Sequence, residues 1–337
     1  MVVNNIKVLH VVGGYPSEKN PQEGIFIKNQ IDSLINEGVV CDVFVLKGRG
    51  FLKYIKGIYS LKKYLKYKYY DIIHAHYMYC GWTARLATKK PVIVSFMGTD
   101  VFGRSNKKGK DVLYSKIIHN VLSNLLCSKI QFAIVKSKKL TEILKTINYK
   151  IIPNGIDLDK FKIINISKVD LKLNNSKKYI LFSGTKKRTE KRYFLALKSV
   201  KELEKRQKNV KLITVNGLKQ EEFIKYLNVV DSLLLTSQHE GSPNIVKEAL
   251  ACNLPVVSVA VGDVSERLEG VDNCYIVESN PKDIAEKLYE VIKSNSRSNN
   301  GRESISNLRI ENVAKEIKLI YSNILLNLFA ILLCVVY

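Results

Sequence analysis

Short apolar runs alternate with longer amphipathic stretches along most of the chain. Runs of this length predict buried parallel strands, and the stretches between them predict helices that cover the strands. The first run, residues 6–12, leads into a glycine pair, and a helix is predicted at 24–36. Further strands are predicted at 39–46, 71–76, 91–96, 130–135, 179–184 and 210–215 and around 233 and 256. The alternation predicts an α/β protein with doubly wound parallel sheets.

The strands fall into two series, and 337 residues are enough for two α/β domains. We predict one domain at residues 1–163, a second at 164–318 and an apolar C-terminal helix or tail at 319–337, with a linker at 162–176. The six cysteines are widely separated, which favours neither a zinc site nor a disulfide framework. The first residues contain no secretory signal, so we expect a cytoplasmic protein.

The segment 238–248 carries the strongest chemical signal, because Glu240 and Glu248 lie on either side of a predicted helix start. It follows a predicted strand, and turns of this kind open on the ligand side of an α/β sheet. Ser242 is predicted to cap the helix and Pro243 to occupy its first position.

That helix start predicts an anion site. The amides of Asn244 and Ile245 would point outward at the positive end of the helix dipole, where a phosphate binds well. Glu240 and Glu248 could then hold hydroxyl groups beside a diphosphate. The alternative for this segment is an ordinary surface helix with a good cap.

This segment, with residues 249–258 and Gly262-Asp263-Val264 after it, resembles the signature region of the retaining family-4 (group 1) glycosyltransferases. The resemblance implies the GT-B fold, in which two Rossmann-like domains face a cleft and the second domain binds a nucleotide-sugar donor. It implies that Glu240 contacts the transferred sugar as a catalytic residue and that Glu248 contacts the ribose. Gly241, Asn244 and Ile245 are expected to complete this part of the donor site.

Residues 182–191 resemble the phosphate-binding turn of the same family, which begins at Gly184 here. In the family an Arg and a Lys of this turn neutralise the donor diphosphate. The Lys corresponds to Lys191. Thr185 stands where the Arg is often found, so Arg188 is the expected substitute. Taken alone, a Lys/Arg cluster in a loop is usually a solvated patch.

The first domain resembles the acceptor side of the family, with Gly14 and Gly24 in the acceptor-side loop. Residues 153–157 resemble its inter-domain motif. Residues 95–101 resemble the family's His-Gly-x-Asp segment, but Met97 occupies the His position. Asp100 is retained, and we expect it to orient an acceptor hydroxyl or the sugar as a second catalytic residue. A lone histidine near a strand end is more often structural, although four could compensate for the missing one: His74, His76, His119 and His239.

The resemblance implies a glycosyltransferase, of the hexosyl class or related to it, that builds a cell-surface polysaccharide or glycoconjugate. The acceptor would be a saccharide or a lipid-linked molecule. Retention would follow from front-face attack, in which the leaving phosphate takes the acceptor proton. Cationic side chains would stabilise the leaving group, so neither a metal nor another cofactor is expected. The rivals are a GT-B nucleotide-sugar epimerase and, on charge alone, a nucleic-acid-binding protein, although no nucleic-acid motif is present.

The net charge of +23 lies mainly in the first half of the chain. Residues 51–150 contain 20 Lys and Arg against 4 Asp and Glu, a net charge of +16, whereas residues 201–337 contain 17 against 18. A segment this basic needs an anionic partner or solvent. Residues 51–70 combine an apolar helical stripe with six lysines and several tyrosines, which predicts either a membrane-surface helix or a helix packed on its own sheet.

The last nineteen residues, 319–337, contain no charged side chain. This is just long enough to cross a bilayer, but Ser322, Asn323 and Asn327 favour a helix docked on the first domain. We therefore expect a peripheral protein on an anionic inner membrane face, with a nucleotide-sugar as donor and no nucleic-acid partner.

Overall fold

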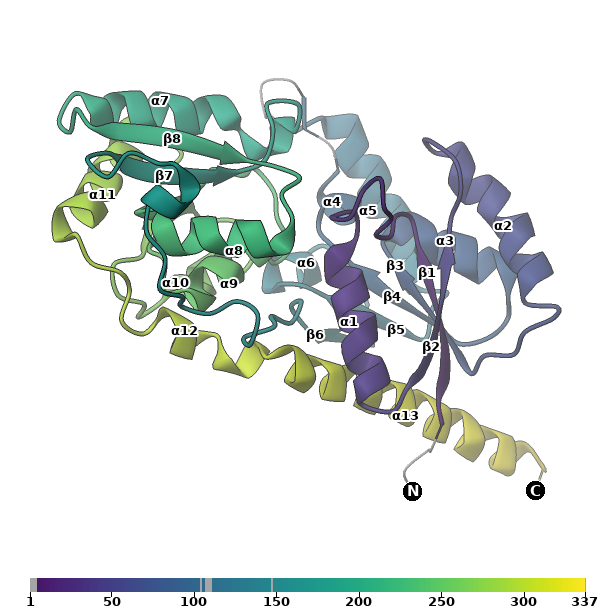
Figure 1. Cartoon of the computed structure of the whole chain (residues 1–337). Helices are drawn as coiled ribbons and strands as arrows, with labels where there is room; N and C mark the ends of the chain where they lie inside the picture. The colour runs from purple at the N-terminus through teal and green to yellow at the C-terminus, as the bar shows by residue number, and fades with distance from the viewer. Residues whose placement is uncertain (1–4, 104, 107–110, 147, 337) are drawn as a thin grey trace. The chain divides into compact units, whose positions relative to one another are not determined.

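The computed structural model describes residues 5–103, 105–106, 111–146 and 148–336, with side chains as far as residue 330. The chain divides into two compact units (Figure 1). Unit 1 contains residues 1–103, 116–155 and 310–337, and unit 2 contains residues 104–115 and 156–309. The limits of the units differ from the predicted boundaries, because unit 1 stops at Gly155 and also includes the C-terminal segment from Ile310 onwards. The predicted linker 162–176 lies within unit 2, where the Ile164 amide donates to Asn228 Oδ1 at 3.0 Å.

Unit 1 is built on a six-stranded, fully parallel sheet with the order β2-β1-β3-β4-β5-β6. Its strands are β1 (Lys7–Val12), β2 (Val40–Val45), β3 (Ile72–His76), β4 (Val92–Phe96), β5 (Phe132–Val135) and β6 (Tyr149–Ile151). Its helices are α1 (Ile25–Asn36), α2 (Leu52–Tyr64), α3 (Met78–Ala87), α4 (Thr99–Phe102), α5 (Leu113–Cys127), α6 (Lys138–Thr141) and α13 (Ile310–Val336). The first residues of α5 are assigned to unit 2.

Side chains alternate in direction along the strands and place apolar residues on both faces of the sheet of unit 1. Val8 and Ile72 face one way and pack with α1 and α13, whereas Leu9 and Ile73 face the other way and pack with α2, α3 and α5. The sheet is therefore covered on both faces, as an all-parallel sheet requires.

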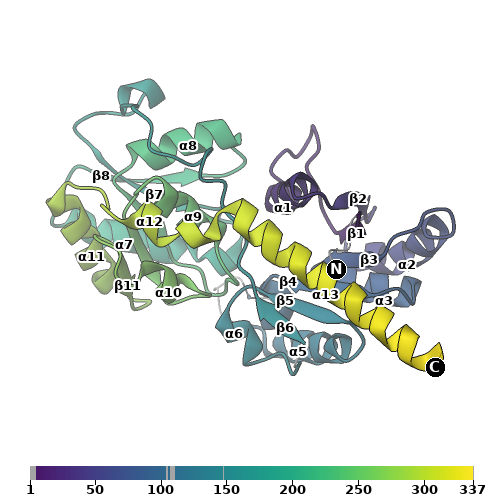
Figure 2. The same cartoon turned by 90° about the horizontal axis from the view of Figure 1, so that it is seen from below.

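The C-terminal segment forms the last part of α13, which lies along the first sheet (Figure 2). Ile317, Tyr321 and Ile324 are buried in the same core as the strand residues Ile6 and Ile93. The predicted docked helix is observed. In the part of the chain that is described, no helix has the length and apolar character needed to cross a membrane.

The predicted apolar stripe of residues 51–65 divides into two parts. Leu61 is buried, and Ile58 and Leu65 pack beside it in the core. Phe51 and Ile55 are exposed instead. The end of the stripe is therefore packed on the sheet, as one interpretation predicts, whereas the start of the stripe is exposed, as the membrane-surface interpretation requires.

Unit 2 is built on a five-stranded parallel sheet with the order β11-β10-β9-β7-β8. Its strands are β7 (Lys178–Ser183), β8 (Val210–Val215), β9 (Ser232–Leu235), β10 (Val256–Val259) and β11 (Tyr275–Val277). Its helices are α7 (Tyr193–Glu204), α8 (Gln220–Val229), α9 (Asn244–Ala251), α10 (Val264–Leu268), α11 (Pro281–Ser294) and α12 (Gly301–Ser304), and its 3₁₀ turns are η1 (Val169–Leu171), η2 (Thr189–Lys191) and η3 (Ser306–Leu308).

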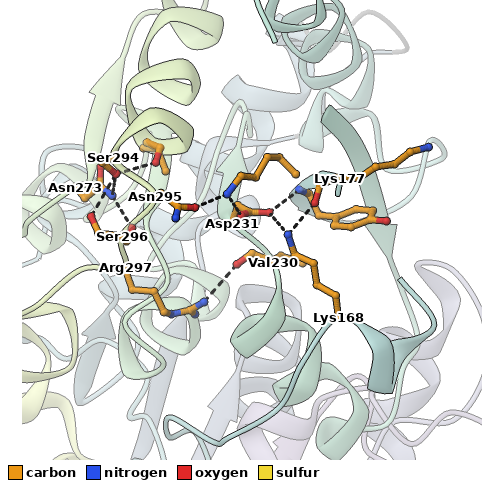
Figure 3. A network of polar contacts seen from close by, with 12 residues as sticks. Lys168, Lys177, Val230, Asp231, Asn273, Ser294, Asn295, Ser296 and Arg297 are labelled. Atoms are coloured by element: carbon orange, nitrogen blue, oxygen red, sulfur yellow. Dashed lines mark hydrogen bonds and ion pairs between the residues drawn. The ribbon is translucent and has the colours of Figure 1, made fainter. Parts of the chain in front are cut away.

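A polar network stabilises unit 2 at the amino ends of β7 and β9 (Figure 3). Asp231 pairs with Lys168 at 3.3 Å and with Lys178 at 3.2 Å, and it accepts the Tyr179 amide at 2.7 Å. The Asp231 side chain is only 16% exposed. Arg297 joins the same region by donating to the Val230 carbonyl. The network ties the segment after Ile156 to the sheet, at the end of the strands away from the candidate site.

Candidate functional site

The strand order of unit 2 indicates where a ligand binds. Adjacent β7 and β9 are followed by connections that run in opposite directions along the sheet, to β8 and to β10. Ligands of open α/β sheets bind at the carboxyl ends of the strands at such a switch point. Two loops meet there, residues 184–192 after β7 and residues 236–243 after β9, and they contain most of the predicted donor-site residues.

Lys191 and Glu240 form the centre of this site. The Lys191 ammonium lies 2.5 Å from Glu240 Oε1, and the two side chains are only 11% and 17% exposed. A pair so poorly solvated interacts more strongly than a surface ion pair. Two separate sequence motifs assigned Lys191 and Glu240 to the same site, and the structure brings their charged atoms together.

Backbone and side-chain bonds join the two loops. The Gln238 amide donates to the Glu190 carbonyl at 2.7 Å, and Thr236 Oγ1 donates to the Lys191 carbonyl at 2.8 Å. The Arg192 guanidinium donates to the carbonyls of Thr236 at 2.6 Å and Ser237 at 3.2 Å. The loops therefore hold Lys191 and Glu240 as one unit.

Arg192 was missed by the sequence reasoning. It adopts a left-handed conformation with φ of 51°, which is uncommon for a residue with a side chain. Its position directly after Lys191 is the sequence feature from which its role could have been predicted. Arg192 is a positioning residue, because its described side-chain bonds go to the loop after β9 and to Ser279.

The predicted role of Ser242 as helix cap is wrong. Helix α9 begins at Asn244 with Pro243 in the cap position, and no side chain caps it. The Ser242 hydroxyl instead donates to Asp263 Oδ2 at 2.8 Å and accepts from Lys247 Nζ at 3.0 Å. A capping serine would accept a backbone amide, but here the hydroxyl oxygen accepts from the Lys247 ammonium, a charged donor, while its proton is donated to the Asp263 carboxylate.

Lys247 is fully buried under the site. Burial lowers its pKa to about 8, against the opposing effect of Asp263 and Glu248. Arg267 also donates to Asp263, at 3.1 Å. This charged network anchors the start of α9 to the loop before α10, and sequence reasoning did not find it.

Gly262 lies against the loop that carries Glu240. It has φ of 58°, and a Cβ atom there would lie 2.4 Å from the Gly241 carbonyl oxygen and 3.1 Å from the Glu240 carbonyl oxygen. Gly184 has φ of 149° and lies beside the Lys191 side chain. The lack of a side chain at Gly262 lets the backbone of Glu240 and Gly241 pack closely against it, and the lack of one at Gly184 leaves room for the Lys191 side chain.

Glu248 lies in the second turn of α9, beyond Asn244 and Ile245. Burial raises its pKa to about 7, although Lys247 and Lys191 act in the opposite direction. Ile245 is the second residue of the helix, where an amide has no partner within the helix. Asn244 and Glu248 are partly exposed, so both are accessible from the site.

Arg188 has a different position from Lys191. Its guanidinium donates to Glu190 at 2.7 Å, and its side chain is 55% exposed. The predicted contact of Arg188 with a phosphate therefore stays a prediction. A second polar contact in this region joins His239 to Asp111. Asp111 belongs to the segment 104–115, which is part of unit 2.

In unit 1, Gly14 and Gly24 lie against each other. Gly24 has φ of 66°, and a Cβ atom there would lie 2.6 Å from the Gly14 carbonyl oxygen. Lys53 of α2 donates to the neighbouring Gly13 carbonyl at 2.7 Å. The two predicted acceptor-side glycines thus form one closed loop at the carboxyl end of β1.

Asp100 is fully buried and anchors backbone. Its Oδ1 accepts the amides of Met97 at 2.9 Å and Gly98 at 2.8 Å, and its Oδ2 accepts the amide of Met78 at 3.0 Å. Burial raises the pKa of Asp100 to about 6, although these amides lower it. The geometry gives Asp100 a positioning role, and its catalytic role stays a prediction.

Three histidines form a buried cluster between the first sheet and α13. His74 bonds to Tyr321 at 2.6 Å and to Ser95 at 2.8 Å, and His10 bonds to His76 at 3.0 Å. Burial lowers the pKa of His10 to about 3 and lowers the pKa of His74 and His76 well below the usual value. These rings are neutral structural groups. Their nitrogens lie within 4.8 Å of one another, which makes them a cluster of potential metal ligands in the described part of the chain.

Two family models match the chain. Residues 196–294 match the model described as Glycosyl transferases group 1, and residues 10–160 match the model described as Glycosyltransferase Family 4. The first range contains Glu240 and Glu248, and the second contains Gly14, Gly24 and Asp100. A curated protein of Bacillus subtilis (strain 168), TuaC, whose name describes a glycosyltransferase of teichuronic acid biosynthesis, is 24% identical over 329 residues, 77% of this chain and 82% of that protein.

Solved structures share the fold. The sucrose-phosphate synthase of Thermosynechococcus elongatus has a TM-score of 0.73 at 16% identity, over 96% of this chain and 99% of that one. Anabaena HepE, in complex with UDP and glucose, has a TM-score of 0.68 at 14% identity, over 93% and 98%. A structure named for a UDP-N-acetylglucosamine 2-epimerase from Listeria monocytogenes has a TM-score of 0.60 at 13% identity, over 93% and 95%. The predicted GT-B fold is confirmed.

Proposed function

The chain belongs to the group 1 glycosyltransferases, and we propose that it transfers a glycosyl unit, with retention, from a nucleotide-sugar to a saccharide or lipid-linked acceptor at a membrane surface. The observation that carries the proposal is the Lys191–Glu240 pair at the switch point of unit 2. It combines a cation for a leaving diphosphate with a carboxylate for sugar hydroxyls. The complex of HepE with UDP and glucose supports a uridine nucleotide as the first donor to test.

The leaving diphosphate gathers negative charge in the transition state, and positive groups fixed in advance stabilise it there. Lys191 supplies a full charge, and the first amides of α9 supply the positive end of a helix dipole. Glu248, one helical turn deeper, is suited to accept hydrogen bonds from the ribose hydroxyls. The acceptor proton would pass to the leaving phosphate on the same face, so this scheme requires neither a metal ion nor a histidine at position 97.

The acceptor and the location are proposed on other grounds. TuaC supports a role in the synthesis of a cell-surface polysaccharide. The net charge of +16 over residues 51–150 supports work beside an anionic inner membrane face. Both points are independent of the donor site, which lies in unit 2.

The experiment is a donor screen with product analysis. Uridine, guanosine and adenosine diphosphate sugars are compared for thermal stabilisation of the protein and for slow hydrolysis. Transfer is then followed by proton NMR, where the anomeric coupling of the first product should equal that of the donor. An inverted coupling would exclude retention. Conversion of the donor to its 2-epimer without an acceptor would favour the epimerase that shares this fold.

A further inference from the structure

The segment 104–115 brings residues from the first half of the sequence to the donor loops. It follows α4, which contains Asp100, and it leads into α5, but it belongs to unit 2. Ser105 and Asp111 of this segment pair in an isolated antiparallel bridge. The bridge fixes the backbone of Asp111 beside that of Ser105, so the two residues lie side by side on unit 2.

These two residues contact both loops that carry the ion pair. In the loop after β9, His239 Nε2 bonds to the Asp111 carboxylate. A carboxylate accepts and does not donate, so the imidazole Nε2 carries the proton of this bond. In the loop after β7, Thr189 Oγ1 donates to the Ser105 carbonyl at 3.5 Å. The bond to Asp111 is the stronger of the two, because its acceptor is charged and the Thr189 contact is long.

Glu240 lies in a stretch whose position depends on side contacts. Residues 236–243 belong to neither a strand nor a helix, so no regular backbone ladder places the Glu240 carboxylate. Gln238 is anchored to the loop after β7, and Gly241 packs against the loop before α10. The His239 side chain, on Asp111, is a third anchor. The residues on both sides of Glu240 are therefore held.

The bond between His239 and Asp111 is shielded from water. The two side chains are only 16% and 31% exposed. A charge-assisted bond at such a place holds its partners more firmly than one on an open surface, where water competes for both. His239 directly precedes Glu240 in the chain, so a change in the position of the imidazole changes the course of the backbone at Glu240.

The His239 anchor differs from the other two in its origin. Gln238 and Gly241 are held by residues between 156 and 309, whereas Asp111 follows shortly after Asp100 in the sequence. In the part of the chain that is described, unit 2 thus completes the support of Glu240 with a residue from the predicted acceptor-side half of the sequence.

We propose that Asp111 is a positioning residue for glycosyl transfer, which acts through His239 and fixes the Glu240 carboxylate where the transferred sugar needs it. The inference rests on the proposed function, because it assigns Glu240 to the sugar. The diphosphate of the donor is expected to contact Lys191 and the first amides of α9 instead. Loss of Asp111 should therefore slow transfer without weakening the binding of the diphosphate.

The test compares Asp111→Ala, Asp111→Asn and His239→Phe with wild type. Circular dichroism and thermal unfolding check that each variant is folded, and kcat and KM are measured with the donor that the screen identifies. The matched control is Asp170→Ala, because the Asp170 carboxylate also accepts bonds within unit 2, from the amide and the hydroxyl of Ser167. This control should transfer at the wild-type rate.

Asp111→Ala and His239→Phe should each lower kcat about tenfold, the lower limit of what a charge-assisted hydrogen bond to the sugar contributes. Asp111→Asn should keep most of the rate, because its amide oxygen still accepts from the imidazole. Calorimetry should show that every variant binds UDP no more weakly than wild type. A wild-type rate in Asp111→Ala would overturn the proposal. So would UDP binding that weakens in step with the rate, because Asp111 would then support the whole loop and not the sugar contact.

A double-mutant cycle decides whether Asp111 acts through Glu240. In a Glu240→Ala background, Asp111→Ala should lower the rate by less than about twofold, because no carboxylate is left to position. The same loss of rate in both backgrounds would show that Asp111 acts on another group, and the proposal would fall.

Hydrogen exchange separates this inference from the proposed function. The amides of residues 236–241 should exchange faster in Asp111→Ala than in wild type or Asp170→Ala, whether or not sugar is transferred. Faster exchange in a protein that transfers sugar from no donor would refute the proposed function and leave the anchoring of the loop intact. Transfer by wild type, with exchange and rate unchanged in Asp111→Ala, would do the reverse.

Discussion

Replacing Glu240 with Gln should strengthen the binding of a free nucleoside diphosphate and slow glycosyl transfer. Without a ligand, the Lys191 ammonium is 2.5 Å from Glu240 Oε1, and both side chains are largely buried. A diphosphate that contacts this ammonium brings a second anion within about 5 Å of the carboxylate. Two unit charges at that separation repel by about 3 kcal/mol at an effective dielectric constant of about 20.

The expected gain is smaller than that limit. The site is partly open, and the diphosphate spreads its charge over several oxygens, so we expect about 1 kcal/mol, which is roughly a fivefold lower Kd. Glutamine keeps the size and the acceptor oxygen of Glu240 and removes only its charge. Transfer should nevertheless be slower, because the sugar loses a charge-assisted hydrogen bond worth about 1.5–3 kcal/mol.

Isothermal titration calorimetry with UDP, GDP and ADP measures the first effect, and initial rates of transfer measure the second. Glu202→Gln is the matched control, because Glu202 pairs with Lys205 on the surface of α7 in the same unit. Lys191→Met should weaken diphosphate binding by about 1.5–3 kcal/mol, since it removes the cation itself. If Glu240→Gln weakens diphosphate binding or leaves it unchanged, the ion pair does not mark the phosphate site.

Four further predictions concern the same unit. The Glu248 carboxyl has a pKa of about 7 in the folded protein, above its ordinary value of 4.5, so its ionisation costs stability as pH rises between these values. Urea unfolding should show wild type losing stability from about pH 4.5 to 7 relative to Glu248→Gln, and parallel curves would show that folding does not raise the pKa of this carboxyl. Asp231→Asn should lower the free energy of unfolding by about 3–5 kcal/mol, because it leaves two lysines without their anion, while UDP binding to the folded protein stays unchanged. Gly262→Ala should weaken donor binding, because its Cβ would displace the Gly241 carbonyl. Gly270→Ala, at a similar φ of 69° with open space around it, isolates the backbone strain, and equal donor affinity in both variants would contradict the displacement. Transfer should survive EDTA, and loss of activity that Mg²⁺ restores would show that a metal holds the diphosphate.

The parts of the molecule that sequence alone predicted are those set by local patterns. The alternation of apolar runs predicted every described strand except the short edge strands β6 and β11, and the segment around Glu240 and Glu248 was correctly predicted as a turn that leads from a strand into a helix. Lys191 was assigned by its motif, and its charged atom does lie beside Glu240. Short-range sequence patterns carry this information because each strand, turn and helix start depends mainly on neighbouring residues.

The parts that sequence did not predict depend on residues far apart in the chain. Ser242 has the features of a helix cap, yet its hydroxyl binds Asp263 and Lys247 instead, and only the fold brings Asp263 to it. Lys247 is buried, but the residues beside it in the sequence give no indication that this lysine would be buried. The exposure of Ile117, Val121 and Leu125 on α5 was not predicted, because an apolar helix face is normally buried and only the packed structure shows which of two apolar faces remains exposed.

The return of α13 to unit 1 has a consequence for synthesis of the protein. All six strands of unit 1 lie between Lys7 and Ile151, but the apolar strip at Val8, Ile72 and Ile93 is covered by α13. The ribosome makes all of unit 2 before it makes that helix, which takes about ten to thirty seconds at ordinary elongation rates. During this interval the nascent first sheet is half covered, whereas unit 2 can complete its core without waiting. The N-terminal unit is therefore the last to be finished, and a chain cut before Ile310 would leave it permanently open to chaperones and aggregation.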